Sequence, residues 1–346
     1  MAPVAEISAP RSAEDTESVR IATIRAAGAG SLPVWVAAEE AFFKRWGVDI
    51  EVVEFSGAGL STQALLMGGV HVAAAAPQLV FAIAASRGQY LKLVHVTANN
   101  VPPVAQLIVS PAADVNGVED LQGKKVALDE MSGGCLACAS FVHRLGQLGF
   151  VANKDFQVAR TAHQRMGEAL ASGIIDAGVM IQPYNTLAIQ DKIGFPLEDP
   201  RLGERGDAAT QLFGTPIRLP GYDRDAGAWL STTAVWTTED YLTRNPEEVH
   251  SVAKAIADAC DWLREPAHAE KAAQVLITHT VGTSESGSFL PTAQALLGTT
   301  VWKSYPDGFS DWKALDQQME VMATLGILTH PVEVKRCVSL PWYLPT

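Results

Sequence analysis

Four short loops place hydrogen-bond donors where a predicted strand gives way to a predicted helix. Their side chains are Ser31, Ser56, Gln78 and Ser132. The first N–H groups of a helix have no partner within the helix, so such loops can hold an anion. Hydroxyl and amide groups add further donors. Any one of these loops is more simply explained as a tight turn or a helix cap, but four of them together favour a ligand site in a cleft.

Four aromatic residues lie on or near the same predicted edge, namely Trp35, Tyr184, Trp229 and Trp236. Aromatic side chains at such an edge can form the walls of a pocket for an organic ligand. For each residue taken alone, packing in the core is the commoner role.

Cys135 and Cys138 form a C-x-x-C pair, a spacing found in redox motifs and in halves of zinc sites. The sequence has no second C-x-x-C and no paired histidines at zinc-finger spacing. The pair follows Gly133 and Gly134 at a helix start made of small residues. We therefore expect two small buried side chains that are neither metal ligands nor an obligatory redox pair.

Several motifs for chemistry are missing. No H-x-x-x-H or H-x-H pair marks a metal site, and neither a G-x-S-x-G nucleophile elbow nor a phosphate-binding P-loop occurs. Gly28 and Gly30 open only half of a dinucleotide-binding fingerprint, because Pro33 stands where its third glycine would be. We therefore expect neither a cofactor nor a metal.

The composition indicates a folded protein of about two domains. The chain has 346 residues, of which 48% are apolar and 18% charged, and its net charge is −12. This apolar fraction excludes global disorder, and the acidic balance argues against a nucleic-acid partner. The longest apolar stretch, residues 70–85, is interrupted by His71, Pro77 and Gln78, which argues against a membrane span.

Residues 1–20 have neither a basic segment nor the apolar run of a secretory signal. We expect a periplasmic or otherwise extracytoplasmic protein if a signal was removed, and a cytoplasmic one if Met1 is the native start.

Strands and helices alternate at short spacing, which predicts parallel α/β sheets whose strand ends share one edge. An internal echo between residues 68–73 and 173–178 suggests two similar lobes. The expected strands are 19–25, 48–55, 70–75, 91–97, 105–109, 123–128, 156–160, 174–181 and 228–237. The expected helices are 33–46, 60–67, 78–87, 118–121, 135–148, 164–172 and 247–264.

Five segments, in order, resemble the periplasmic solute-binding proteins of the nitrate/sulfonate/taurine type, a family that also includes thiamine-pyrimidine synthase-like proteins. The resemblance extends from about residue 18 to 334. His71 stands where the family usually has Asp, and Ala41 where it often has Gly. The segments are 32–53 (LPVWVAAEEAFFKRWGVDIEVV), 64–73 (ALLMGGVHVA), 118–127 (VEDLQGKKVA), 168–177 (EALASGIIDA) and 245–249 (NPEEV).

The resemblance implies an α/β protein with the two-lobe type II fold of periplasmic binding proteins. Each lobe would be a mostly parallel sheet flanked by helices, with a two-strand hinge. Residues 1–19 would be a disordered lead-in and 336–346 a tail. Residues 20–100 and 225–335 would form lobe 1, and residues 104–215 lobe 2, with crossovers near 99–103 and 219–224.

The resemblance also implies a substrate-binding protein of an ABC importer that captures a small organic anion, sulfonate- or carboxylate-like, between its lobes. It would act as a monomer and deliver its ligand to the importer's permease. No arginine lies in the donor loops, so N–H and hydroxyl groups would hold the anion. The expected ligand contacts are Ser31, Leu32, Ser56, Gly57, Gln78, Ser132, Gly133, Gln182 and Tyr184, to which we add Trp35 and Trp236.

The alternative is an intracellular enzyme on the same fold, similar to the pyrimidine synthase or to an aromatic desulfinase. The synthase relatives carry Lys and His after the third strand and a cysteine-rich cluster, whereas this chain has neither Lys nor His at residues 74–79. The desulfinase type has a cysteine in the first loop, where this chain has residues 28–31 without one. These absences favour the binding protein.

Overall fold

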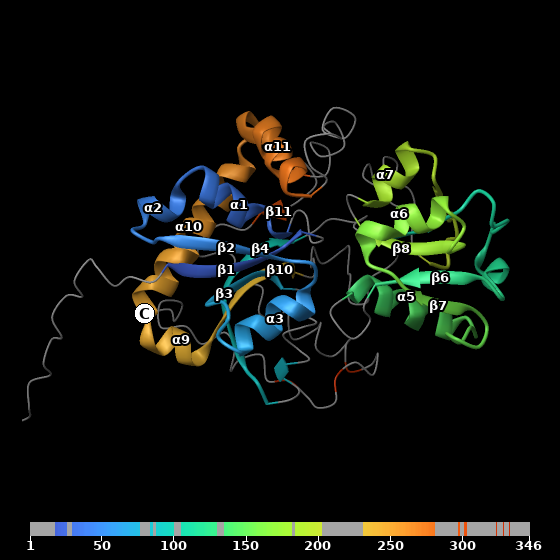
Figure 1. The fold of residues 1–346 in the computed structure, drawn as a ribbon, viewed down its shortest axis with the longest axis horizontal. Helices are drawn as coiled ribbons and strands as arrows, with labels where there is room; N and C mark the ends of the chain where they lie inside the picture. Colours follow the sequence, from blue (N-terminus) through green and yellow to red (C-terminus); the bar gives the residue numbers. More distant parts are fainter. Residues whose placement is uncertain are drawn as a thin grey trace, which may run out of the picture.

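The protein contains two mixed β-sheets, each covered by helices on both faces (Figure 1). The structure is a computed structural model. It describes residues 18–25, 30–76, 84–85, 88–99, 105–129, 135–181, 184–202, 231–280, 297, 301–302, 323, 328 and 332. Among these, no helix combines the length and the apolar character needed to cross a membrane.

The first sheet is built from six strands in the order β11-β4-β10-β3-β1-β2. Strands β2, β1 and β3 run parallel, and β10 lies antiparallel between β3 and β4. The bounds are β1 Val19–Ile24, β2 Ile50–Phe55, β3 Val72–Ala76, β4 Leu91–Asn99, β10 Ser231–Thr238 and β11 Val301–Trp302.

Successive residues of these strands face opposite apolar layers, as the period of two in a strand requires. Ile21 and Val235 pack in one layer, while Ala22 and Trp236 pack in the other. The first layer also contains α1 Leu32–Glu39, α2 Phe42–Arg45, α10 Pro246–Arg264 and α11 Ala269–Thr280, and the second contains α3 Ala58–Leu66. Helix α9 Glu239–Arg244 and the 3-10 turn η3 Pro266–His268 flank α10.

The second sheet has the order β7-β6-β8-β5-β9, in which β7, β6 and β8 are parallel and β5 is antiparallel to β8 and β9. The 3-10 turn η2 Val118–Leu121 and α5 Leu136–Gln147 cover one face, and α6 His163–Ala171 and α7 Tyr184–Gln190 cover the other. The strands are β5 Ala105–Val109, β6 Lys125–Leu128, β7 Gln157–Arg160, β8 Ala177–Ile181 and β9 Phe195–Pro196.

The two-lobe α/β fold is confirmed, and most strands of each sheet point the same way, β1 to β4 in the first sheet and β6 to β9 in the second. In the first sheet, β10 enters antiparallel, and in the second sheet β5 does. Strand β5 follows β4 of the first sheet along the chain, and β10 follows β9 of the second sheet. Neither strand is therefore connected to a neighbour in its own sheet by the right-handed β-α-β crossover that makes strands parallel. The predicted crossovers at 99–103 and 219–224, and with them the hinge, lie almost wholly outside the described residues.

The predicted helix 33–46 is two helices, because Ala41 adopts a left-handed conformation with φ 57°. This break ends α1 and starts α2 without any proline. Asn245 precedes α10 as expected, but its side chain does not cap that helix. Its amide instead donates to the Tyr241 carbonyl of α9, at 3.3 Å.

The internal echo of the sequence is a repeated hydrogen-bond arrangement. In the first lobe, the N–H of Arg20 at the start of β1 donates to Nδ1 of His71, at 3.1 Å. In the second lobe, the N–H of Lys125 at the start of β6 donates to a carboxylate oxygen of Asp176, at 2.7 Å. The backbone N–H of His71 and of Asp176 returns to the same partner residue's carbonyl, each at 2.9 Å. An imidazole nitrogen therefore replaces a carboxylate oxygen in the first lobe.

The left-handed backbone at Ala41 predicts that glycine at this position would make the protein more stable. A non-glycine residue in this region has its Cβ close to the following carbonyl, at a cost of about 1–2 kcal/mol. We expect Ala41→Gly to raise the free energy of unfolding by about 0.5–1 kcal/mol, after subtraction of glycine's larger unfolded-state entropy. Ala38→Gly, at an exposed helical position of α1, is the matched control and should lower it by about 1 kcal/mol. Urea unfolding checks both, and destabilisation by Ala41→Gly would contradict the argument.

The hydrogen bond that His71 accepts predicts how substitutions at this position affect stability. Removal of the acceptor by His71→Ala leaves the Arg20 N–H unpaired and should lower the free energy of unfolding by about 1–3 kcal/mol. His71→Asp restores an acceptor of the kind that Asp176 supplies, so it should lose clearly less. Thermal unfolding compares the two variants, and equal losses would show that the ring's stacking on Tyr241, at 4.6 Å between centroids, matters more than the hydrogen bond.

Candidate functional site

The carboxyl ends of the parallel strands lead into the region where residues of the two lobes meet. Ile24, the last residue of β1, is 2% exposed and belongs to the same apolar cluster as Met166 and Tyr184 of the second lobe. Ala58, the first residue of α3, packs against this cluster. Ligands of open α/β sheets bind beyond the carboxyl ends of the strands, so this edge is the candidate site.

Ser31 closes the first loop rather than offering its hydroxyl to solvent. Its Oγ accepts from the N–H of Ile24 at 2.9 Å and donates to the Ile24 carbonyl at 3.0 Å, and the side chain is fully buried. Both hydrogen-bonding functions of the hydroxyl are thus used inside the fold. Ser31 can reach a ligand only through its backbone.

Leu32, Trp35 and Trp236 are core residues, each at most 1% exposed. Leu32 and Trp35 pack in the layer beneath α10, and Trp236 packs on the opposite face of the sheet beside α3. Trp35 also stacks on His279, with ring centroids 4.6 Å apart. The commoner role of aromatic residues, packing, accounts for both tryptophans in this conformation.

A network of charged groups lies next to this edge on the first lobe. Arg25 follows β1, its side chain is 54% exposed, and it forms an ion pair with Glu54 at 2.9 Å. Nδ1 of His279 lies 3.3 Å from Glu54, and its Nε2 lies 3.1 Å from Glu39. Burial would raise the pKa of Glu54, but hydrogen bonds with Arg25 and His279 hold that pKa below its ordinary value. The carboxylate therefore stays ionised beside Arg25.

Ser56 and Gly57 precede α3 in the positions expected for an anion loop. Gly57 is the N-cap residue in extended conformation, and no side chain caps the helix. Ser56 is exposed, so its hydroxyl can reach solvent. Among the residues that the structure describes, the first N–H groups of α3 have no side-chain acceptor, and they lie on the edge that contains Ile24 and Arg25.

Tyr184 brings a buried phenol to the same place from the second lobe. It is 8% exposed, and among the described residues its hydroxyl has no hydrogen-bond partner. Burial raises the pKa of Tyr184 to about 12, with Arg25 lowering it and Asp129 raising it further. The phenol therefore remains protonated and can donate a hydrogen bond. Four other expected contacts, Gln78, Ser132, Gly133 and Gln182, lie outside the described residues.

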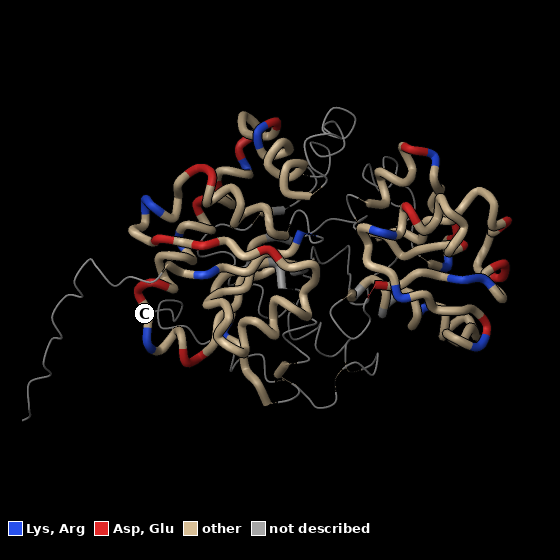
Figure 2. The backbone as a smooth tube through the Cα atoms, in the orientation of Figure 1, with Lys and Arg blue, Asp and Glu red and all other residues tan. Residues whose placement is uncertain are grey.

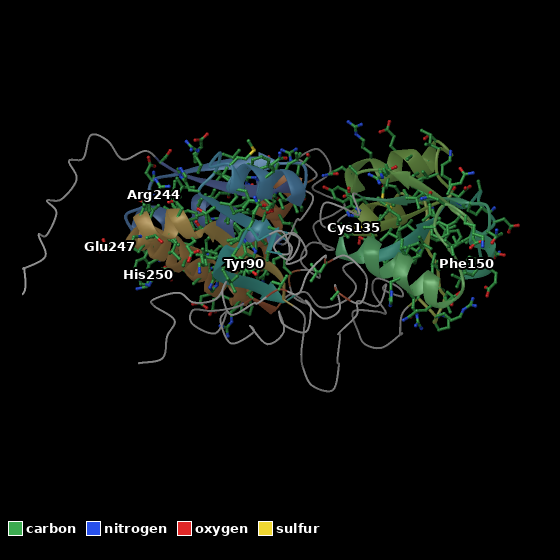
Figure 3. All side chains as sticks on the ribbon, turned by 90° about the horizontal axis from the view of Figure 1, so that it is seen from below. Tyr90, Cys135, Phe150, Arg244, Glu247 and His250 are labelled. Carbon is green, nitrogen blue, oxygen red and sulfur yellow. A yellow bond between two sulfur atoms is a disulfide. The ribbon has the colours of Figure 1, made fainter. Side chains whose placement is uncertain are left out.

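Cys135 and Cys138 are bonded to each other in the structure, a disulfide that the expectation of two small buried side chains did not include. Cys135 is the N-cap of α5, and its sulfur accepts from the N–H of Cys138 at 3.1 Å. Figure 3 shows Cys135 at the inner end of the second lobe, toward the first lobe, with Phe150 at the opposite end. The Cα atoms of the pair are 5.2 Å apart, within the range that a disulfide requires.

His163 lies beside this disulfide and is buried at the start of α6. Its Nε2 is 3.8 Å from Sγ of Cys135 and 3.3 Å from a carboxylate oxygen of Asp129. Burial lowers the pKa of His163, opposed by the Asp129 carboxylate and by the Val179 backbone. The imidazole is thus held neutral.

This arrangement differs from a Cys-His-Asp catalytic triad. In a triad, the two ring nitrogens serve different partners, so that the acid orients the ring while the other nitrogen takes the proton. Here the sulfur and the carboxylate both face Nε2, whereas Nδ1 is buried and has no hydrogen-bond partner among the described residues. The geometry therefore does not support nucleophilic catalysis by Cys135.

Asp129 and His163 were missed as functional candidates in the sequence. Their positions in the sequence could have indicated them, because Asp129 directly follows strand β6 and His163 begins the helix after β7. Parallel strands end at one edge, so both residues had to approach each other and the start of α5.

The comparisons with known proteins agree with this architecture. The family model described as NMT1/THI5 like matches residues 29–269, more than half of the chain. No curated protein matches the chain in sequence.

Three solved structures show the same fold at low sequence identity. The alkanesulfonate-binding protein SsuA of Xanthomonas axonopodis pv. citri, bound to MOPS, is 17% identical with a TM-score of 0.69, covering 94% of this chain and 99% of that one. The Candida albicans CA3427 product, described as having the generic periplasmic binding protein fold, is 14% identical with a TM-score of 0.66, covering 94% and 97%. The nitrate-binding protein NrtA of Synechocystis PCC 6803 is 14% identical with a TM-score of 0.63, covering 92% and 84%.

At these identities the structural likeness establishes the periplasmic-binding-protein fold, with its two α/β lobes. Together with the match over residues 29–269, it shows that the chain belongs to the NMT1/THI5-like family.

Proposed function

We propose that the protein is a solute-binding protein that captures a small organic anion between its two lobes. The observation that carries the proposal is that Arg25, a half-exposed cation, directly follows Ile24, which packs in one cluster with Tyr184, a buried phenol with no hydrogen-bond partner among the described residues. A cation and a neutral donor from opposite lobes are the groups that an anion needs when the lobes close on it.

The charge of the protein makes a local anion site necessary. The chain as a whole has a net charge of −12, and acidic and basic residues are distributed over both lobes (Figure 2). An anion therefore gains little from the overall field and depends on groups at the site. Such groups are Arg25, the uncapped start of α3 and the Tyr184 hydroxyl. In this proposal, Arg25 contributes more to the binding of the anion than the loop residues Ser31 and Ser56 do.

The structural neighbours support an anionic ligand. One of them is an alkanesulfonate-binding protein and another a nitrate-binding protein. An organic anion agrees better than bare nitrate with a site that includes the aromatic ring of Tyr184 and the apolar side chain of Ile24.

The same proposal extends to partners and compartment. A binding protein of an importer delivers its ligand to a permease outside the cytoplasm, and we propose that this chain does so as a monomer. The disulfide between Cys135 and Cys138 agrees with an oxidising compartment. We also propose residues 20–100 with 225–335 as one lobe and residues 104–215 as the other.

A ligand screen tests the anion class. Thermal shift with taurine, alkyl and aryl sulfonates, nitrate, aromatic carboxylates and pyrimidines should stabilise the protein with organic anions, by about 2.7 kcal/mol at a hundred times the dissociation constant. If only neutral compounds raise the melting temperature, the anion proposal is wrong. If a compound is converted at catalytic protein concentration, the protein is an enzyme.

Single variants test the two groups that carry the proposal. Tyr184→Phe removes a hydrogen bond to a charged group and should weaken binding of the identified anion by about 1.5–3 kcal/mol. Arg25→Gln should weaken it by at least as much, because it removes the cation. Isothermal titration calorimetry measures both.

Matched controls separate ligand contacts from general destabilisation. Tyr241→Phe removes a phenol that donates to Glu248 at 2.6 Å, and Arg45→Gln removes an exposed cation 3.9 Å from Asp258. Both controls should leave the affinity unchanged. Unchanged affinity in Tyr184→Phe and Arg25→Gln as well would place the ligand elsewhere.

A further inference from the structure

The geometry points to a second site in the protein: after reduction of the disulfide, Cys135, Cys138 and His163 form a binding site for a thiophilic divalent metal such as Zn²⁺, with Asp129 at the fourth position. This inference goes beyond the capture of an anion and does not depend on it.

The four residues come from three segments that meet at one edge of the second sheet. Asp129 follows β6, Cys135 caps α5, Cys138 lies in its first turn, and His163 begins α6. Sγ of both cysteines and a ring nitrogen of His163 lie within 4.8 Å of one another. A C-x-x-C pair with a histidine is a frequent zinc ligand set, and carboxylates also bind this ion.

The two separations that involve Nε2 of His163 are close to those between ligands of a tetrahedral zinc ion. With Zn–S bonds of about 2.3 Å and Zn–N and Zn–O bonds of about 2.1 Å, tetrahedral angles place S and N about 3.6 Å apart and N and O about 3.4 Å apart. Nε2 of His163 lies 3.8 Å from Sγ of Cys135 and 3.3 Å from the Asp129 oxygen. The two sulfurs must separate to about 3.8 Å once their bond is broken, and the Asp129 oxygen, which lies outside the group within 4.8 Å, must move toward them.

The convergence on one nitrogen distinguishes a metal site from the alternatives. The sulfur and the carboxylate face the same Nε2, which is the arrangement around a shared ion rather than that of a proton relay. A structural disulfide alone needs neither a buried imidazole nor a carboxylate beside it. His163 is nine-tenths buried, so packing within the fold holds its ring beside the two cysteines.

The reaction balances with a dithiol as the reductant. The dithiol gives two electrons and two protons to the Cys135–Cys138 bond, which yields two thiols, while the dithiol becomes a disulfide. Zn²⁺ then displaces the two thiol protons and binds the thiolates, the neutral imidazole and the carboxylate. The disulfide and the metal therefore exclude each other.

Cobalt(II) provides a direct readout on the full-length protein. The protein is reduced anaerobically, the reductant is removed, and Co²⁺ is added in steps. We expect sulfur-to-cobalt charge-transfer bands and the intense visible bands of tetrahedral cobalt, saturating at one ion per chain, and their loss on addition of Zn²⁺. The oxidised protein should show none of these bands.

Variants identify the ligands. Cys135→Ser and Cys138→Ser should abolish the charge-transfer bands of the paired thiolates, and His163→Gln and Asp129→Asn should each weaken Zn²⁺ binding by at least about tenfold. His143→Gln, on the exposed side of α5, and Cys260→Ala, in the first lobe, are matched controls that should bind as the parent does. Circular dichroism of each variant verifies that it is folded.

Two results would overturn the inference. One is a reduced, folded protein that binds no Co²⁺ or Zn²⁺, and the other is binding that persists in the folded double variant of Cys135 and Cys138. The outcome is separate from that of the anion proposal, because anion binding is measured on the oxidised protein without metal and metal binding on the reduced protein without anion.

Discussion

The parallel pairing of strands within each lobe is the constraint on which the candidate sites depend. Because β1 runs parallel to β2 and β3, and β6 runs parallel to β7 and β8, the loops after these strands must lie along one edge of each sheet. The contact of Ile24 with the cluster of Tyr184 brings these two edges together. Arg25, Tyr184, Asp129 and His163 then approach one another although they are far apart in the chain.

The edge also accumulates polar groups that the fold itself does not satisfy. Most buried polar atoms have hydrogen-bond partners, and each unpaired one costs about 1–3 kcal/mol. The hydroxyl of Tyr184 and Nδ1 of His163 are two such atoms among the described residues. Both lie in the second lobe, next to the strand ends, and a ligand that accepts a hydrogen bond from Tyr184 would offset the cost of the unpaired phenol. Elsewhere in the same lobe the corresponding needs are met internally, as Asp176 does for Lys125.

In each lobe, a side chain of a different type accepts a hydrogen bond from the equivalent backbone N–H group. Each lobe's first parallel strand begins with an N–H that needs an acceptor, which is His71 in one lobe and Asp176 in the other. The ring of His71 also stacks on Tyr241, so the first lobe couples the start of β1 to α9. A histidine can replace the aspartate without a change in backbone geometry, because the N–H group requires only an acceptor lone pair in the same position.

Much of the fold could be predicted from the sequence because it depends on local periodicity and turn residues. The alternation of strands and helices, the echo around residues 71 and 176, and the break in family pattern at Ala41 are all visible in the chain itself. The reversed direction of β5 and β10 could not be predicted, because these strands pair with strands that are distant in sequence. The arrangement of the site could not be predicted either. The hydroxyl of Ser31 bonds to Ile24, and Trp35 and Trp236 are packed in the core. Cys135 meets His163, which is 28 residues away in the chain.

The sequence by itself determined which residues could donate, ionise or bind a metal. Only the tertiary structure decided which of them meet, because such contacts depend on how two sheets pack rather than on the order of residues.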